Sequence, residues 1–398
     1  MSNHSAGQSL GGESARDGVM RFFVSAGEPS GDLHAANLFR SLRARHPGAE
    51  CFGFGGPQLA AAGADVLFPL ASHAIMGLSG IAQALPTMFR IARLALDEVA
   101  RRRPTAAVLI DYPGFHWHLA KRMRRAGVPV ISFVPPQIWA WASHRVYKMR
   151  RCFHRVLCSL PFEEAWYRDR GVTAEYVGHP YFDELHRQRV DVEFVESLRN
   201  RRGPTIAVLP GSRGGELDRN LEMQIRALRI ISRARPNARI QFACFKDEHR
   251  QRVMAAADSA GIAIAAHVGR MAEILSAADA AIAVSGSVGL ELLHHGVPSV
   301  VVYRVNRLYR AIARRVLNVP FISIVNLLAE RELFPEFLTC EDASAAIAAR
   351  VLRWLDSQSD AEKVRESLRA LKRRVGQPGA CDRAAAAIIE CAGRSLAA

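Results

Sequence analysis

Short apolar segments alternate with amphipathic helical stretches along most of this chain, and this alternation constrains the fold more than any other feature. The segment RFFVSAG at 21–27 precedes a helical stretch at 32–45, and TAAVLI at 105–110 and VPVISFV at 128–134 are almost wholly apolar. Strands covered by helices on both faces have such continuous apolar runs, because neither face meets water. The pattern predicts the α/β class, with doubly wound parallel sheets.

The alternation starts a second time after a charged segment at 188–204, which ends in a glycine-proline pair. Such a pair is typical of a boundary, and 398 residues suffice for two ordinary domains. We therefore expect a disordered tail at 1–20 and two facing Rossmann-like domains at 21–200 and 201–365. Ligands of such sheets lie in the cleft beyond the carboxyl ends of the strands.

The chain is strongly basic. Lysine and arginine number 53 against 38 aspartates and glutamates, which gives a formal net charge of +15. This excess favours anionic partners such as phosphates, nucleotides, nucleic acid or an acidic membrane surface. We expect no nucleic-acid partner, because no recognition motif for DNA or RNA occurs and the basic residues are spread widely.

Cysteine usage and hydropathy indicate the compartment. The 7 cysteines form no CxxC pair and are irregularly spaced, as is typical of reduced thiols. No apolar run approaches the roughly 18 residues of a spanning helix, and residues 1–20 lack the apolar core of a secretory signal. We therefore expect a cytoplasmic protein, for which contact with a membrane surface stays open.

The first strand is followed by a turn that suits a ligand. Glu28, Ser30, Gly31 and Asp32 lie where the strand ends and its helix begins. Small residues there let a backbone approach a ligand closely, and the helix start presents free N–H groups. Alternatively, Ser30 or Asp32 only caps the helix.

Asp111 directly follows a fully apolar strand. A carboxylate in that place faces the cleft, and partial burial raises its pKa toward the range in which a general base works. The alternative is a loop carboxylate that caps the next helix or pairs with an arginine.

Two turns of the second series have the same character. In the first, Gly211 and Ser212 offer backbone donors and Arg213 offers a charged fork that suits phosphate. In the second, at 285–291, helix N-terminal amides could hold a diphosphate. Its candidates are Ser285, Gly286, Ser287 and Glu291. The alternatives are an ordinary turn with a surface arginine, and a glutamate that only complements the helix dipole.

The segment at 76–103 combines apolar residues with arginines and ends in three consecutive arginines. Such a helix could lie in a bilayer interface and attract anionic lipid, or it could simply cover the sheet with a solvated basic face. The candidate membrane-facing residues are Leu78, Ile81, Leu85, Met88 and Phe89.

Several histidines and tryptophans carry weaker signals. His116 and His118 form an HxH pair and His294 has a histidine neighbour, but no third ligand follows at metal spacing, so we expect no metal. Trp139 and Trp141 follow a proline-rich turn, and they either line the cleft or pack between the domains.

Taken together, the motifs resemble those of lipid-A-disaccharide synthases, a family of inverting glycosyltransferases, from about residue 22 to residue 338. The motifs that carry the resemblance are SAGEPSGD (25–32), GFGGPQLAAAG (53–63), MGLSG (76–80), DYPGF (111–115), VPPQIWAW (134–141), LPFE (160–163), VGHP (177–180), LPGSRGGE (209–216), SGSVGLE (285–291), YR (303–304) and NLLAERELFPEFL (326–338).

The resemblance implies a GT-B fold and a reaction. The donor would be UDP-2,3-diacylglucosamine and the acceptor 2,3-diacylglucosamine 1-phosphate (lipid X), and the products would be lipid A disaccharide 1-phosphate and UDP. No metal or other cofactor is implied. The family further implies a peripheral position on the inner face of the cytoplasmic membrane, with residues 76–96 toward the bilayer. Some members form homodimers. The resemblance implies that the domain at 21–200 is the acceptor and membrane side and that the domain at 201–365 is the UDP-sugar donor side, with C-terminal helices, here 366–398, returning to the N-terminal domain.

The resemblance also implies roles for single residues. Asp111 matches the general base, and with Glu28 and Arg213 it makes up the catalytic set that we predict. The predicted substrate-binding residues are Ser30, Gly31, Asp32, Gly211, Ser212, Ser285, Gly286, Ser287, Glu291 and Asn326. The family often has Ala-Pro-Asp-Phe-Asn after the base, where this chain has Tyr-Pro-Gly-Phe-His at 112–116.

The sequence leaves two alternative functions open. One is another GT-B enzyme that uses a UDP-sugar, either an epimerase or a transferase. The other is a non-catalytic protein that binds lipid or nucleotide at a membrane surface.

Overall fold

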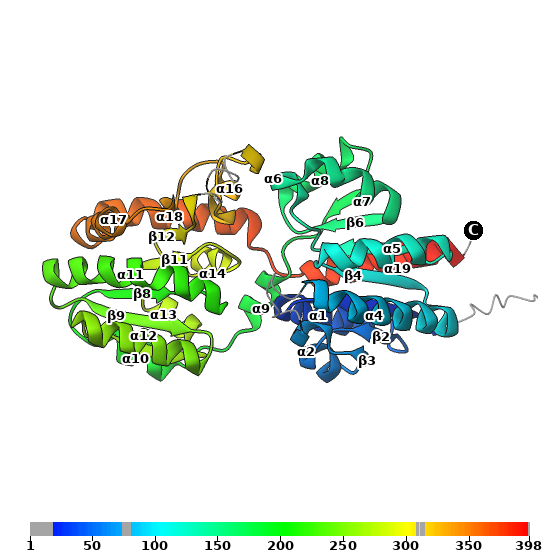
Figure 1. The fold of residues 1–398 in the computed structure, drawn as a ribbon, viewed down its shortest axis with the longest axis horizontal. Coiled ribbons are helices and arrows are strands. Elements are labelled where there is room, and N and C mark those ends of the chain that lie inside the picture. The colour runs from blue at the N-terminus through cyan, green and yellow to red at the C-terminus, as the bar shows by residue number, and fades with distance from the viewer. Residues whose placement is uncertain (1–18, 74–80, 308–309, 311–314, 397–398) are drawn as a thin grey trace, which may run out of the picture.

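The computed structural model describes residues 19–396 apart from 74–80, 308–309 and 311–314. Figure 1 shows two lobes, each a parallel sheet between helices. The first sheet has the strand order β3-β2-β1-β4-β5-β6-β7 and the second the order β10-β9-β8-β11-β12-β13. The predicted α/β class with two doubly wound domains is confirmed.

The first lobe contains the elements before the connecting segment. Its strands are β1 (Arg21–Ala26), β2 (Glu50–Phe54), β3 (Asp65–Phe68), β4 (Ala106–Ile110), β5 (Val130–Phe133), β6 (Arg155–Cys158) and β7 (Ala174–Tyr176). Its helices are α1 (Pro29–Arg45), α2 (Pro57–Ala61), α3 (Leu70–His73), α4 (Ile81–Arg102), α5 (Pro113–Arg125), α6 (Ile138–Trp141), α7 (Val146–Cys152) and α8 (Pro161–Arg168), and α9 (Tyr181–Arg187) leads out of the lobe.

The second lobe repeats the plan. Its strands are β8 (Thr205–Leu209), β9 (Arg239–Cys244), β10 (Ala265–Val268), β11 (Ala280–Val284), β12 (Ser299–Arg304) and β13 (Glu336–Thr339). Its helices are α10 (Val192–Arg199), α11 (Gly214–Ala234), α12 (Asp247–Ala260), α13 (Met271–Ser276), α14 (Val288–His295), α16 (Ile324–Ala329), α17 (Ser344–Asp356) and α18 (Gln358–Val375). The last helix, α19 (Ala380–Leu396), lies on the first lobe.

The central strands are buried on both faces, as their apolar sequences predict. Every residue of β4, β8 and β11 is buried. In β1, Phe23 faces the core beneath α4 and α5, whereas Phe22 and Val24 face the core beneath α1 and α19. Burial of these side chains from water on both faces is the main force that joins sheet and helices.

Each sheet has a point at which the chain reverses its direction of winding. β1 lies between β2 and β4, and β8 lies between β9 and β11. Loops that leave the carboxyl ends of such neighbouring strands diverge and leave a crevice, which is the usual ligand site of an open α/β sheet. The four turns predicted from the sequence follow the carboxyl ends of β1, β4, β8 and β11.

The lobe boundaries differ from the predicted 200 and 366. α10 already belongs to the second lobe, because its Leu198 lies in that lobe's core and Arg199 donates to the backbone oxygen of Ser276. α18 stays there as well, with Leu368, Leu371 and Val375 in the same core. Only α19 crosses back and packs along α1, as Figure 1 shows in red. Helical periodicity alone does not reveal which lobe an amphipathic helix covers.

Candidate active site

Asp111 occupies the carboxyl end of β4 in an unusual backbone conformation. Its φ is 50° and that of Tyr112 is 54°, which is left-handed backbone that residues other than glycine rarely adopt. Tyr112 packs over Gly27, where a Cβ atom would come within 2.2 Å of the Tyr112 ring. The turn after β4 is thus fitted against the turn after β1, and strained backbone of this kind is frequent at functional sites.

The surroundings of Asp111 favour its neutral form. Burial, with the negative charge of Glu28 nearby, raises the pKa of Asp111 from 3.8 to about 6, against the opposing effect of Arg213. A carboxylate with this pKa is mostly ionised at neutral pH and still accepts a proton readily.

His116 fixes the backbone of this turn. Its Nδ1 lies 2.5 Å from the backbone oxygen of Asp111 and its Nε2 lies 2.8 Å from Oγ of Ser25. Burial lowers the pKa of His116 to about 4, so the ring is neutral and has one N–H. A carbonyl oxygen only accepts, so Nδ1 donates to Asp111 and Nε2 accepts from Ser25. The sequence indicated His116 only as half of an HxH pair. Its position five residues after Asp111 was the signal that could have revealed this contact.

Glu28 and Arg213 meet between the two lobes. Nη2 of Arg213 lies 3.2 Å from Oε2 of Glu28, and Nη1 lies 3.5 Å from Oε1 of Glu216. The side chain of Arg213 is 68% exposed and that of Glu28 is 37% exposed, so solvent screens the pair. The fold therefore brings together Glu28, Asp111 and Arg213, which come from three different turns.

The other first-lobe candidates have mainly structural contacts. The buried carboxylate of Asp32 accepts from the backbone N–H groups of Gly56 (2.7 Å), Gln58 (2.9 Å) and Leu59 (3.1 Å), so it holds the start of α2. Gly31 is also buried, and a Cβ atom there would stand 3.4 Å from that of Ala26. Ser30, in contrast, is exposed in the first turn of α1.

The second-lobe turns leave backbone groups open to a ligand. Gly211 (φ 109°) and exposed Ser212 follow β8, and Gly286 (φ 155°) and exposed Ser287 follow β11. The hydroxyl of Ser285 donates to the backbone oxygen of Ile322 at 3.1 Å, which ties this turn to the segment before α16. Both turns precede helices whose first N–H groups have no partner within the helix.

Glu291 is buried in α14 and joins this helix to the segment between the lobes. Its Oε1 accepts the hydroxyl of Tyr181, and its Oε2 has no hydrogen-bond partner among the described residues. Burial raises the pKa of Glu291 to about 7. An oxygen without a partner in a buried site is costly, which leaves it available to a ligand hydroxyl.

Asn326 is fully buried, and its side chain is saturated with hydrogen bonds. Oδ1 accepts from the N–H groups of Leu333 (2.8 Å) and Phe334 (2.9 Å), and Nδ2 donates to the backbone oxygen of Phe334 (2.7 Å) and to Glu336 (2.8 Å). It therefore holds α16 against the strand β13, and no donor or acceptor is left for a substrate.

The predicted membrane-facing residues are only partly within the described structure. Leu78 lies outside the described residues, as do the side chains of Ile81 and Leu85. Met88 packs against the first-lobe core, whereas Phe89 is 61% exposed. Across the described residues, no helix has the length and apolarity that a membrane span requires.

The two tryptophan candidates differ in their surroundings. Nε1 of Trp139 donates to the buried Glu163 at 2.9 Å, whereas Trp141 is 41% exposed. Within the described ranges, no three side chains of His, Cys, Asp or Glu gather as metal ligands do.

The family model and the relatives that match this chain indicate the same family. The family model described as lipid-A-disaccharide synthetase matches residues 22–390. The lipid-A-disaccharide synthase of Myxococcus xanthus is 38% identical over 371 residues, which cover 93% of this chain and 97% of the relative. That of Anaeromyxobacter dehalogenans is 36% identical over 376 residues, again with 93% and 97% coverage.

Solved structures share the architecture at low sequence identity. UDP-GlcNAc 2-epimerase from Neisseria meningitidis, bound to UDP-GlcNAc, matches with a TM-score of 0.65 and 9% identity over 93% of this chain and 100% of its own. MurG from Acinetobacter baumannii matches with a TM-score of 0.54 and 14% identity over 94% of this chain and 100% of its own. These likenesses bear on the fold alone, and they confirm the predicted GT-B type.

Proposed function

This chain belongs to the lipid-A-disaccharide synthase family, and from this premise we propose the substrates and the role of each site residue. The chain is a UDP-sugar-dependent glycosyltransferase of lipid A disaccharide synthesis. We propose UDP-2,3-diacylglucosamine as donor and 2,3-diacylglucosamine 1-phosphate as acceptor. The observation that carries the mechanism is the placement of Asp111, with its raised pKa, beside Glu28 and Arg213.

The proposed reaction is a single displacement with inversion. Asp111 takes the proton of the acceptor hydroxyl, and the hydroxyl oxygen attacks the anomeric carbon of the donor from the face opposite UDP. The bond from that carbon to the diphosphate breaks as the new glycosidic bond forms. A pKa of about 6 supports this role, because it lies close to the working pH of a general base.

Arg213 is proposed to stabilise the negative charge that grows on the leaving diphosphate. Its guanidinium stays charged and carries several N–H donors, and the open turns at 211–212 and 286–287 add backbone N–H groups. Because Arg213 pairs with Glu28 in this structure, binding of the diphosphate would exchange one anionic partner for another.

We also propose that the first lobe contacts an anionic membrane surface. Residues 112–162 contain nine lysines and arginines and no aspartate or glutamate. Trp141 and Tyr147 are 41% and 46% exposed, and the guanidinium of Arg145 lies 4.8 Å from the Trp141 ring centroid. Aromatic rings beside basic groups suit the interface between lipid headgroups and acyl chains.

Vesicle sedimentation tests the membrane proposal. Phosphatidylglycerol vesicles should retain the protein better than phosphatidylcholine vesicles, and the double variant Trp141→Ala, Tyr147→Ala should weaken retention. Phe245→Ala, which removes an aromatic side chain that is 63% exposed on the second lobe, is the matched control. Equal retention by both vesicle types would contradict the proposal. The homodimer stays a prediction, which light scattering tests.

The activity assay combines the purified chain, both acylated substrates and no added metal. Mass spectrometry should find the disaccharide 1-phosphate, with one UDP released for each disaccharide formed. An epimer of the UDP-sugar, or free sugar without disaccharide, would favour the epimerase alternative instead. Vesicle binding without any UDP release would favour a non-catalytic protein.

A further inference from the structure

A cavity of about 370 Å³ lies on the second lobe, next to the turns described above but lined by other residues. Its walls include Arg219 near the start of α11, Arg304 at the end of β12, Arg307 shortly after it, and Cys340 just after β13. These residues belong to the carboxyl edge of the second sheet, the edge that also carries Arg213. In this kind of sheet that edge is where ligands bind.

The wall of this cavity is positively charged. Three of its residues are arginines and one, Asp218, is acidic, so the formal charge of the lining is 3 − 1 = +2. Asp218 is itself paired with Arg252 of α12. Arg219 and Arg307 have no ion pair with any residue that the structure describes. The positive charges of Arg219 and Arg307 therefore favour an anionic ligand.

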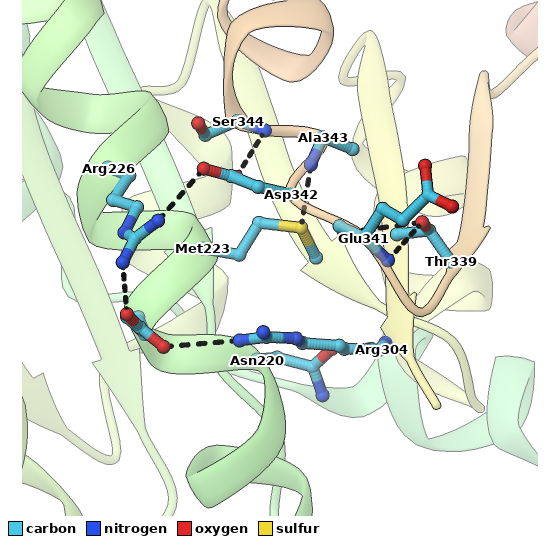
Figure 2. Close-up of polar contacts among 10 residues, drawn as sticks. Asn220, Met223, Arg226, Arg304, Thr339, Glu341, Asp342, Ala343 and Ser344 are labelled. Carbon is cyan, nitrogen blue, oxygen red and sulfur yellow. Dashed lines mark hydrogen bonds and ion pairs between the residues drawn. The ribbon is translucent and has the colours of Figure 1, made fainter. Parts of the chain in front are cut away.

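Two residues outside the cavity lining, Asn220 and Glu222, hold Arg304 in place. Its backbone N–H donates to Oδ1 of the buried Asn220 at 2.7 Å, and its Nη1 lies 3.2 Å from Glu222. Figure 2 shows Arg304 and Arg226 on either side of the same carboxylate, with Arg226 continuing to Asp342. Only one guanidinium nitrogen of Arg304 has a described partner, so its other N–H donors remain for a ligand.

We propose that this cavity binds a phosphomonoester and that the bound group is the phosphate of the sugar 1-phosphate acceptor. The assignment of the acceptor rests on the proposed function, whereas the phosphate site itself rests on the cavity. A phosphomonoester carries a charge near −2 at neutral pH and has three terminal oxygens. It therefore matches both the +2 lining and the three arginine forks.

A phosphodiester or a carboxylate matches this cavity less well. Each carries a single negative charge and two free oxygens, which one guanidinium can satisfy. On this assignment, the second lobe binds two phosphate-bearing ligand groups on one edge of its sheet. The donor diphosphate lies at Arg213, after β8, and the acceptor monoester lies two strands further along, at Arg304 of β12.

Cys340 offers a test that needs no turnover. Because it is partly exposed in the cavity wall, a bound ligand should protect its thiol from N-ethylmaleimide. Inorganic phosphate and glucosamine 1-phosphate, each at ten times its dissociation constant, should slow alkylation of Cys340 by about tenfold. Cys391 on α19, also partly exposed, is the internal control and should react at an unchanged rate. Unchanged alkylation of Cys340 would overturn the phosphate site.

Arginine variants link the protection to the cavity. The double variant Arg219→Gln, Arg307→Gln should abolish protection, and because both side chains are exposed it should remain folded. Arg229→Gln removes one exposed charge from the same helix, outside the cavity, and should keep protection. Equal protection in both variants would overturn the role of the arginines.

Kinetics identify the source of the phosphate. In the double variant the KM for the acceptor should rise by about tenfold to a hundredfold, with the KM for the donor unchanged. An unchanged acceptor KM, with protection by inorganic phosphate still lost, would overturn the acceptor assignment and leave a site for free phosphate. Absence of turnover in the wild type would refute the proposed function, whereas the alkylation result would still decide the phosphate site.

Discussion

The imidazole of His116 binds the backbone carbonyl of Asp111 rather than its carboxylate, with Nδ1 2.5 Å from that oxygen. The contact fixes the left-handed turn at residues 111 and 112 without engaging the carboxylate, which has the backbone N–H of Tyr112 as a hydrogen-bond partner. His116 is therefore a positioning residue, anchored in turn by Ser25 on β1.

Replacement of His116 tests this positioning role. His116→Ala removes the donor to the Asp111 carbonyl, so we expect kcat to fall by about tenfold or more while the KM values change little. His116→Asn keeps an N–H donor of similar reach, and the related family often has asparagine at this place, so it should restore most of kcat. A loss as large in His116→Asn as in His116→Ala would contradict the role.

Replacement of Asp111 tests the general base. Asp111→Asn should lower kcat on the order of a hundredfold or more, because the amide cannot accept the hydroxyl proton. It should also raise the melting temperature. The pKa of Asp111 is higher in the folded protein than its usual 3.8, so ionisation costs stability as pH rises through that interval. Asp258→Asn, on the surface of α12, is the control. Near wild-type turnover would remove Asp111 from catalysis.

The pH dependence follows from the same pKa. The base must be ionised, so kcat/KM should fall as pH drops through about 6 and level off above it. Glu28→Gln removes a negative charge that raises this pKa, so the acidic limb should move to lower pH. The profile is measured from pH 5 to 9 in both proteins. A limb that stays in place, or moves upward, would refute the electrostatic coupling.

Arg213 should matter for the chemical step more than for folding. Arg213→Gln removes the guanidinium that we propose to face the diphosphate, and we expect kcat to fall by about a hundredfold to a thousandfold. Its side chain is 68% exposed, so the melting temperature should hardly change. Arg229→Gln controls for the loss of one charge. Wild-type kcat in Arg213→Gln would place the diphosphate elsewhere.

Asp32 should show the opposite behaviour. Asp32→Ala leaves three N–H groups at the start of α2 without their acceptor, and we expect a loss of about 2–4 kcal/mol in unfolding free energy. Ser30→Ala, two residues away and exposed, should change it by less than about 0.5 kcal/mol. Calorimetry of both variants measures these changes in the free energy of unfolding. A stable, folded Asp32→Ala protein that has lost donor or acceptor binding would instead make Asp32 a ligand residue.

The sequence by itself determined the sheet architecture and the turns on which the site is built. Strands such as β4 and β8 are recognisable because each is buried on both faces, a property written locally in consecutive apolar residues. The glycines at 211 and 286 mark turns for an equally local reason, since their positive φ excludes most side chains. The edge strands β3 and β13 are short and only partly buried, so they lack the continuous apolar run of a central strand.

Only the tertiary structure decided which polar residues are available to a substrate. Asp32 and Asn326 look like ligand residues in the sequence, but distant N–H groups occupy their oxygens. Glu28 and Arg213 are 185 positions apart, and only the facing of the two lobes makes them partners. Burial of an apolar strand depends on its own residues, whereas the partners of a polar side chain depend on segments that folding brings from elsewhere in the chain.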